Sequence, residues 1–173
     1  MAALPSSTVK RVLLYRFDRL PAEGIVNPSA YLLNEGVELI SVGGTLQTIS
    51  FREIKALCFI SESGKATLFS EHNYFERRPK SPGLWTRFTL RDGDELDGIL
   101  PHNLLEWPES GYVITPPKAG ATRQRVFLPR AALTRTELRG VVGRSAAQPV
   151  SRRPSRPEQE NQLNIFDLRS DQG

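Results

Sequence analysis

Short runs of alternating apolar and polar residues, broken by glycine, proline and aspartate, dominate the chain as far as Gly143. Residues 87–91 (Arg-Phe-Thr-Leu-Arg) alternate with a period of two, which is typical of a half-buried strand. Asp92 and Gly93 supply turn residues and residues 95–100 resume the alternation, so this stretch predicts a β-hairpin. Helical signals are limited to single turns. The pattern predicts an all-β protein of short strands.

The pattern also occurs twice along the chain. Gly24 and Gly98 each follow a carboxylate and precede two aliphatic residues, and similar apolar runs follow both glycines. Lobes of about 65 residues bury only about 60% of their unfolded-chain surface and would be marginally stable alone, so we expect two lobes to pack together. We therefore predict a first small β-barrel over residues 1–62, a connector over 63–83, a second small β-barrel over 84–143 and a disordered tail over 144–173.

Residues 88–93 and 96–100 resemble the first motif of Sm-like proteins, in which a turn glycine and a bent second strand build a five-stranded SH3-like barrel. Residues 126–133 fall where the second motif of that family lies, although its Arg-Gly pair is replaced here by Pro129 and Arg130. The resemblance implies two tandem SH3/Sm-like small barrels. It supports this fold more than RNA binding, because the base-binding loop of the family is poorly matched. The chain also resembles an uncharacterised bacterial family built from such tandem units.

Composition and charge narrow the cellular setting. The net charge of +4 permits nucleic-acid binding but is low for a dedicated duplex-binding domain. The single cysteine, Cys58, has no partner for an internal disulfide, which is typical of a reducing compartment. No signal peptide is visible at the start, and no apolar run approaches the roughly 20 residues that span a bilayer. We expect a cytoplasmic protein without a membrane partner.

Catalytic, cofactor and metal motifs are missing from the sequence. The acidic turn over residues 92–97 lacks the ligand spacing of a calcium loop, so a solvated hairpin tip is favoured over a cation site. His72 and His102 have no neighbouring Cys or His that would indicate zinc. The chain contains neither a nucleophile elbow nor a phosphate-binding glycine loop. We predict a non-catalytic protein with no cofactor and no metal.

Basic residues close to aromatic rings form one candidate binding site. Tyr74, Phe75 and Trp85 flank a pair of arginines, a mixture that binds single strands by stacking and phosphate contact. Basic residues of the second barrel would extend it into a stripe. The alternative is that the rings close the gap between the barrels while the arginines face solvent. The candidate nucleic-acid-binding residues are Arg77, Arg78, Arg125 and Arg130.

The tail carries a second candidate site. Residues 162–166 (Gln-Leu-Asn-Ile-Phe) resemble the peptide with which bacterial proteins bind the replication sliding clamp. The resemblance implies that the Gln bonds at the rim of the clamp's groove while the apolar side chains fill its pocket. An apolar cluster on an otherwise polar arm favours a protein partner; the alternative is that the segment folds back onto the barrels. The candidate partner-binding residues are Gln162, Leu163, Ile165 and Phe166.

Two functional hypotheses follow. The leading one is a non-catalytic adaptor that engages a protein partner through its tail, with the sliding clamp as the specific candidate. The alternative is a module that binds single-stranded nucleic acid or RNA through its Sm-like barrels.

Overall fold

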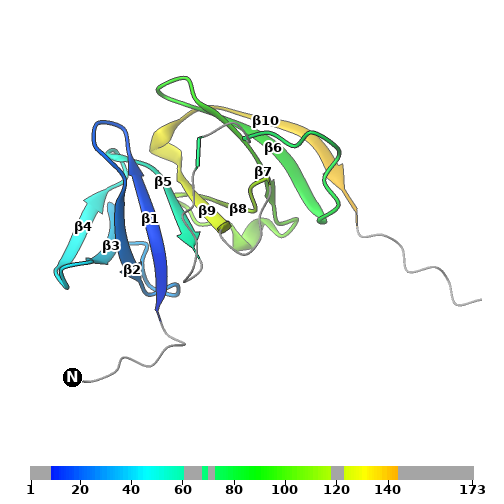
Figure 1. Cartoon of the computed structure of the whole chain (residues 1–173). Coiled ribbons are helices and arrows are strands. Elements are labelled where there is room, and N and C mark those ends of the chain that lie inside the picture. The colour runs from blue at the N-terminus through cyan, green and yellow to red at the C-terminus, as the bar shows by residue number, and fades with distance from the viewer. Residues whose placement is uncertain (1–8, 61–67, 70–72, 118–122, 144–173) are drawn as a thin grey trace, which may run out of the picture.

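The computed structural model describes residues 9–60, 68–69, 73–117 and 123–143 (Figure 1). These residues form strands and two short 3-10 turns with no α-helix among them, so the prediction of an all-β protein is confirmed. The predicted tail, residues 144–173, lies outside the described residues. No helix in the described part is long and apolar enough to cross a bilayer.

The first half contains β1 (Lys10–Arg16), β2 (Ala22–Val26), β3 (Gly36–Ser41), β4 (Leu46–Ser50) and β5 (Ile54–Ile60). The second half contains β6 (Gly83–Leu90), β7 (Glu95–Leu100), η1 (Leu104–Glu106), β8 (Gly111–Ile114), β9 (Arg123–Pro129), η2 (Arg130–Ala132) and β10 (Leu133–Val142).

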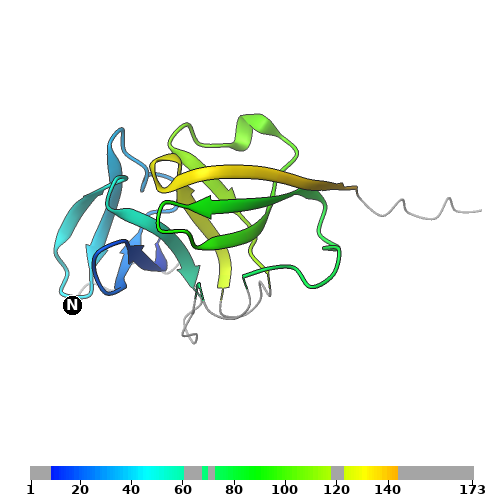
Figure 2. The ribbon, with the colours of Figure 1, turned by 90° about the horizontal axis from the view of Figure 1, so that it is seen from above.

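The strands form a seven-stranded and a three-stranded antiparallel sheet (Figures 1 and 2). The larger sheet has the order β4-β3-β2-β1-β5-β9-β8, and the smaller one has the order β10-β6-β7. A single bridge between Ile99 and Thr115 connects β7 to β8. The two sheets therefore follow one another in a single strand order that begins at β4 and ends at β10.

The pairing register of the first half has a counterpart in the second half. Val12 of β1 faces Gly24 of β2, and Thr86 of β6 faces Gly98 of β7. Thr86 follows Val12 in the sequence by the same number of residues as Gly98 follows Gly24. The other pairs of β1 with β2 recur in the same way between β6 and β7. The β1–β5 and β6–β10 ladders also carry a bulge at the same relative place. The β6–β7 and β6–β10 ladders thus have the same register as the β1–β2 and β1–β5 ladders.

The sheets are not closed into barrels, which corrects the prediction of two closed small barrels. Closure of the first half would need β5 to meet β4, but the outer edge of β5 pairs with β9 instead, for example Leu57 with Phe127. In the second half, backbone hydrogen bonds between β7 and the end of β8 are limited, among the described residues, to the bridge of Ile99 with Thr115. The physical reason lies in β5, where all residues but Phe59 are buried. A strand that is apolar on both faces is favoured in the middle of a sheet rather than at its edge.

Two hydrophobic cores flank the junction of β5 with β9, which we call the seam, and each core takes residues from both halves. The first core gathers residues of β1 to β5 but also includes Phe127 of β9. The second core surrounds Phe88 and includes Ala56 and Cys58 of β5. Each core is thus built from residues of both halves, so the seam is an internal part of the fold.

A charged contact also joins β5 to the second half. Lys55 of β5 forms ion pairs with Asp92 (2.6 Å from Nζ to Oδ2) and Asp94 in the β6–β7 turn. Burial disfavours the charged ammonium, but hydrogen bonds to the two carboxylates outweigh burial, so the pKa of Lys55 is raised. Burial also disfavours the charged carboxylate of Asp92, but the hydrogen bond from Lys55 outweighs it and the pKa of Asp92 is lowered. Both shifts indicate a pair that stabilises the folded state at neutral pH.

Candidate functional site

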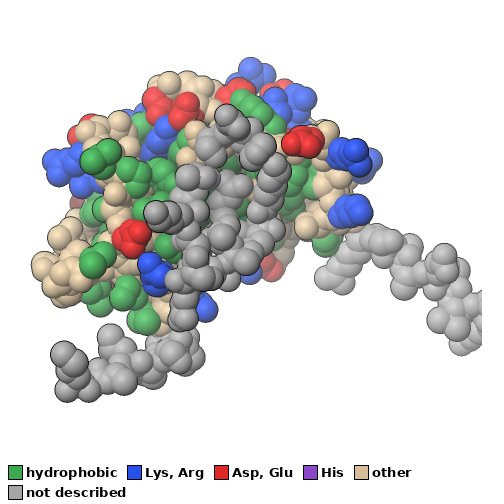
Figure 3. All heavy atoms as spheres, in the orientation of Figure 1, with side chains coloured by type: hydrophobic (Ala, Val, Ile, Leu, Met, Phe, Trp, Pro, Cys, Tyr) green, Lys and Arg blue, Asp and Glu red, His purple; other side chains and the backbone are tan. Residues whose placement is uncertain are grey.

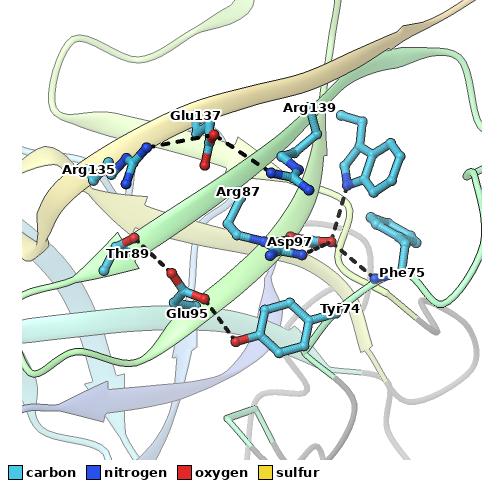
Figure 4. A network of polar contacts seen from close by, with 10 residues as sticks. Tyr74, Phe75, Arg87, Thr89, Glu95, Asp97, Arg135, Glu137 and Arg139 are labelled. Atoms are coloured by element: carbon cyan, nitrogen blue, oxygen red, sulfur yellow. Dashed lines mark hydrogen bonds and ion pairs between the residues drawn. The ribbon is translucent and has the colours of Figure 1, made fainter.

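Residues 73–79, which precede β6, are held against β7 by a buried carboxylate (Figure 4). Asp97 is fully buried. Its carboxylate accepts hydrogen bonds from Arg87 Nε at 2.7 Å and from the Trp85 indole N–H and the Phe75 backbone N–H, both at 3.2 Å. Its own backbone N–H donates to the Asn73 carbonyl at 2.8 Å. A carboxylate with this many donors is a satisfied buried charge, and here it fixes the place of the 73–79 segment.

For Asp97, the sequence-based interpretation of a solvated acidic turn is wrong. The residue faces Arg87 across the β6–β7 ladder. Opposite charges at facing positions of a predicted hairpin are a signal that could have identified this pair from the sequence. Asp92 and Asp94 of the same turn remain partly exposed while they pair with Lys55.

The aromatic residues beside the arginine pair are each held by a neighbouring side chain. The Phe75 ring packs edge-on against Trp85, with ring centroids 6.2 Å apart. The Tyr74 ring lies 4.5 Å from the Arg87 guanidinium, and its hydroxyl donates to Glu95 at 3.0 Å (Figure 4). These contacts fix the rings in place, and the 44% exposure of Tyr74 leaves part of its surface open to a ligand.

Three hollows near β7, β8 and β9 are neighbours, because each shares lining residues with the next, and we call them together the β7–β9 groove. The first hollow, about 380 Å³, is lined by residues 74–81 together with Ile99 and Thr115. The second, about 460 Å³, shares Ile99 and Thr115 with the first and extends to Arg125. The third, about 430 Å³, shares Arg125 with the second and is lined by Tyr31. Backbone pairing between β7 and the end of β8 is limited to the bridge at Ile99 and Thr115, and both of these residues line the first two hollows.

Basic side chains line the groove from end to end. Arg77 and Lys80 are exposed in the first hollow, Arg125 is exposed between the second and third, and Lys10 is exposed in the third. Among the described residues none of these four forms an ion pair, so their charges are available to an anionic ligand.

The charge of the surface is nonetheless mixed. Two carboxylates, Glu76 and Glu106, also line the groove. Figure 3 shows acidic and basic side chains interspersed around the rim of the face it displays. A surface of this kind suits a ligand that meets a few cations in a row rather than one that needs a dense basic face.

Aromatic rings form the floor of the third hollow. Tyr31 and Phe59 pack edge to face, with centroids 5.5 Å apart. Burial raises the pKa of Tyr31 to about 12, and the positive charge of Arg125 opposes part of this shift. The phenol therefore stays neutral at physiological pH. Of the two rings, Tyr31 is buried in the first core and Phe59 is partly buried, so Phe59 offers apolar ring surface in the hollow that Arg125 also lines.

The structure brings together three of the four arginines that the sequence singled out. Arg77 and Arg78 line the first hollow and Arg125 lines the next two. Arg78 also donates to the Val141 carbonyl at 2.9 Å, so part of its guanidinium is engaged. Arg130 lies apart from the groove, because its guanidinium stacks 4.7 Å from the Tyr112 ring and donates to that hydroxyl.

Other sequence-based site expectations fall elsewhere. The four tail residues, Gln162, Leu163, Ile165 and Phe166, lie outside the described residues. Lys10 and Tyr31 of the groove were not identified from the sequence, because they come from the first half and reach the groove only through the β5–β9 pairing. Within the described ranges, no three His, Cys, Asp or Glu side chains gather as a metal site, and Cys58 is buried.

Comparisons with known proteins place the chain in a family rather than beside a characterised relative. Neither the search of curated proteins nor the search of solved structures gives a match. A family model matches residues 8–140, which include every described strand except the end of β10. By this match, the chain belongs to a family of unknown function, DUF6982.

Proposed function

We propose that this protein is a non-catalytic binding protein whose β7–β9 groove holds a single strand of nucleic acid. The observation that carries the proposal is the run of four cations along the groove, none of them paired with a described carboxylate, with aromatic rings at both of its ends. Single-strand-binding surfaces combine these two elements, because cations track the phosphates while bases stack on rings. The exposed part of Tyr74 serves one end, and the partly buried ring of Phe59, which packs against the buried Tyr31, serves the other.

Arg125 is the central residue of this proposal. It lies between the second and third hollows, so it contacts the strand whichever way the ends are seated. Each phosphate contact on a single strand contributes a slope of about −0.7 to the dependence of log affinity on log salt. Three or four contacts give an expected slope of about −2 to −3, so the affinity should fall steadily as salt is added.

The experiment is a titration of the full chain against a fluorescein-labelled oligothymidine of about 15 nucleotides, read by anisotropy at several salt concentrations. Arg125→Glu should weaken binding at least about tenfold, which corresponds to about 1.4 kcal/mol. The matched control is Arg19→Glu, which makes the same change of charge at an exposed turn residue outside the groove. Equal losses in the two variants would show that binding follows net charge alone and would contradict the groove.

The tail motif supports a second proposed role, docking on a protein partner, with the replication clamp as the specific candidate. The supporting feature is the Gln-Leu-Asn-Ile-Phe sequence over residues 162–166. A pull-down with purified clamp should succeed with the full chain and fail with Leu163→Ala/Phe166→Ala. Asn164→Ala is the control, because the motif asks only for a small or polar residue there. The double variant should keep its single-strand affinity, so the two roles can be tested separately.

We further infer that the two halves are copies of one SH3/Sm-like unit, opened rather than closed. What supports this is the shared register, in which the pairs of β1 with β2 recur at a constant offset between β6 and β7. The fifth strand recurs too: Leu14 faces Leu57, and its counterpart Phe88 faces Thr136. The single buried cysteine fits a reducing, cytoplasmic setting for both proposed roles.

A further inference from the structure

The two outer strands, β4 and β10, are open edges. Each pairs with one neighbour among the described residues, β4 with β3 and β10 with β6. An open edge presents unpaired backbone N–H and C=O groups and is normally blocked by proline or charge. β4 (Leu46–Ser50) contains neither. Each edge also exposes a large apolar side chain, Leu46 at 60% and Leu138 at 59%.

The seam inside the chain is a template for what these edges can bind. β5 is the fifth strand of the first half, and it pairs with β9, the fourth strand of the second half. By the shared register, the free strand β10 corresponds to β5, and the free strand β4 corresponds to β9. The correspondence of β4 with β9 is supported by two equivalent backbone hydrogen bonds. After β4 the Phe51 N–H donates to the Glu35 carbonyl, and after β9 the Arg130 N–H donates to the Ser110 carbonyl. The two outer strands, β4 and β10, are therefore the counterparts of β9 and β5, which already pair with each other inside the chain.

The register carries this correspondence to single residues. In the seam, Leu57 faces Phe127, Cys58 faces Val126 and Phe59 faces Arg125. The residues of β10 that hold the matching places against β6 are Thr136, Glu137 and Leu138. The residues of β4 that hold the matching places against β3 are Thr48, Gln47 and Leu46. A second seam would thus put Leu138 directly opposite Leu46.

We propose that β10 of one chain pairs with β4 of a second copy in the register of the internal seam, so that copies associate head to tail. This proposal rests on the inferred equivalence of the two halves. The contact explains why both edges expose a leucine, since each covers the other in the pair. The other facing pairs, Thr136 with Thr48 and Glu137 with Gln47, bring no like charges together.

The association is weaker than the internal seam. Leu57, Phe127, Cys58 and Val126 are buried in the two cores, whereas the corresponding residues of the free edges are polar. A contact between two different patches is heterologous, so it continues until a ring closes or a filament forms. We expect reversible assembly over the range from about 1 µM to about 1 mM that weak associations occupy.

The test is sedimentation velocity of the full chain across that concentration range. The weight-average mass should rise above the 19.4 kDa of one chain. Leu46→Arg and Leu138→Arg should each return the mass to that of a monomer up to at least about tenfold higher concentration. Leu105→Arg is the control, because Leu105 is 95% exposed but lies on neither edge strand.

Mixing the two edge variants distinguishes head-to-tail pairing from other contacts. The Leu46→Arg chain keeps an unchanged β10, and the Leu138→Arg chain keeps an unchanged β4. In an equimolar mixture these two edges should pair, and the product should be a dimer that grows no further. A mixture that stays monomeric overturns the proposal, as does a monomeric wild-type chain at all concentrations. Loss in only one variant indicates a symmetric contact of one edge and also overturns it.

Folding of the variants is checked by circular dichroism, and the milder pair Leu46→Gln and Leu138→Gln should weaken assembly in the same sense. Single-strand binding by the groove is measured on the same samples. Because the groove residues lie on neither free edge, the edge variants should keep their affinity for oligothymidine. Assembly and the proposed nucleic-acid function can therefore fail independently.

Discussion

Single residues fix the close approach of strands in this protein. Gly98 of β7 lies against Ile114 of β8, where an added Cβ would come within 2.8 Å of the Ile114 Cβ. Gly24 of β2 is equally tight against Leu39 and the Ile40 carbonyl. The sequence singled out both glycines by their spacing, and the structure gives each a steric reason.

Gly98→Ala should lower the free energy of unfolding by about 1 to 3 kcal/mol, because Ile114 cannot move away at its Cβ. Gly140→Ala is the control, since its added Cβ would meet nothing nearer than Trp85 at 3.8 Å and should change stability by less than about 0.5 kcal/mol. Urea titration followed by circular dichroism measures both. Equal effects of the two substitutions would contradict a steric requirement at Gly98.

Lys55→Met should lower stability by about 1 to 2 kcal/mol at pH 7, a value reduced because Asp92 and Asp94 are more than a third exposed and water screens their charges. The lowered pKa of Asp92 means that its contribution is present above its unfolded pKa of about 4 and is lost as pH falls through the folded value. The raised pKa of Lys55 means that its contribution persists until pH exceeds 10.5.

The difference between Lys55→Met and wild type should therefore be largest between about pH 4 and pH 10 and should shrink in acid. Urea titrations at pH 7 and pH 3 measure this difference. Arg19→Met serves as the control, because its exposed pair with Asp18 spans 4.0 Å. If the difference in free energy of unfolding between wild type and Lys55→Met does not change with pH, Lys55 acts through packing alone.

At the scale of elements, alternation in the sequence was a sound guide where strands have one solvated face. The β6–β7 hairpin, over residues 83–100, is predicted from the period-two pattern and the Asp-Gly turn; β6 alternates buried and partly exposed residues, whereas β7 is buried from Leu96 to Leu100. β5 has no such alternation, because both of its faces are covered, so the sequence did not reveal that it sits at the centre of a sheet. The groove was only half predicted for the same reason: its arginines were recognised, while Lys10 and Tyr31 depend on a long-range pairing.

Asp97→Asn should detach the 73–79 segment from β7. The substitution removes the negative charge that pairs with Arg87, whose side chain is only 25% exposed. We therefore expect the free energy of unfolding to fall by about 2 to 4 kcal/mol. Limited trypsin digestion should then cut faster after Arg77, and oligothymidine affinity should fall because one wall of the groove is lost. Glu95→Gln is the control, since Glu95 bonds Tyr74 and Thr89 but does not hold the segment backbone.

At the scale of the whole molecule, the seam makes the two halves interdependent. Each core includes residues from the strands of the other half. Sequence spacing indicated two lobes that pack together, but it could not show that a strand edge of one lobe would be completed by the other. That outcome depends on backbone pairing between residues far apart in the sequence, such as Leu57 and Phe127, which no local pattern encodes.

The chain should therefore unfold in one cooperative transition by calorimetry. Phe127→Ala should lower its stability by about 3 to 5 kcal/mol and shift that single transition as a whole, because Phe127 is fully buried in the core of the opposite half. Leu104→Ala, an exposed position in η1, should leave the transition in place. Two separate transitions in the wild-type chain would contradict the shared cores.

The shared cores also bear on how sequences of this family can diverge. Phe127 packs against the rings of Tyr31 and Phe51, with centroids 6.1 and 6.0 Å away, although both partners lie far upstream. Residues in contact across a core change size together over evolution. Among homologues, position 127 should covary with positions 31 and 51 more strongly than with its own neighbours, and a recombinant that joins halves from distant members should fold poorly.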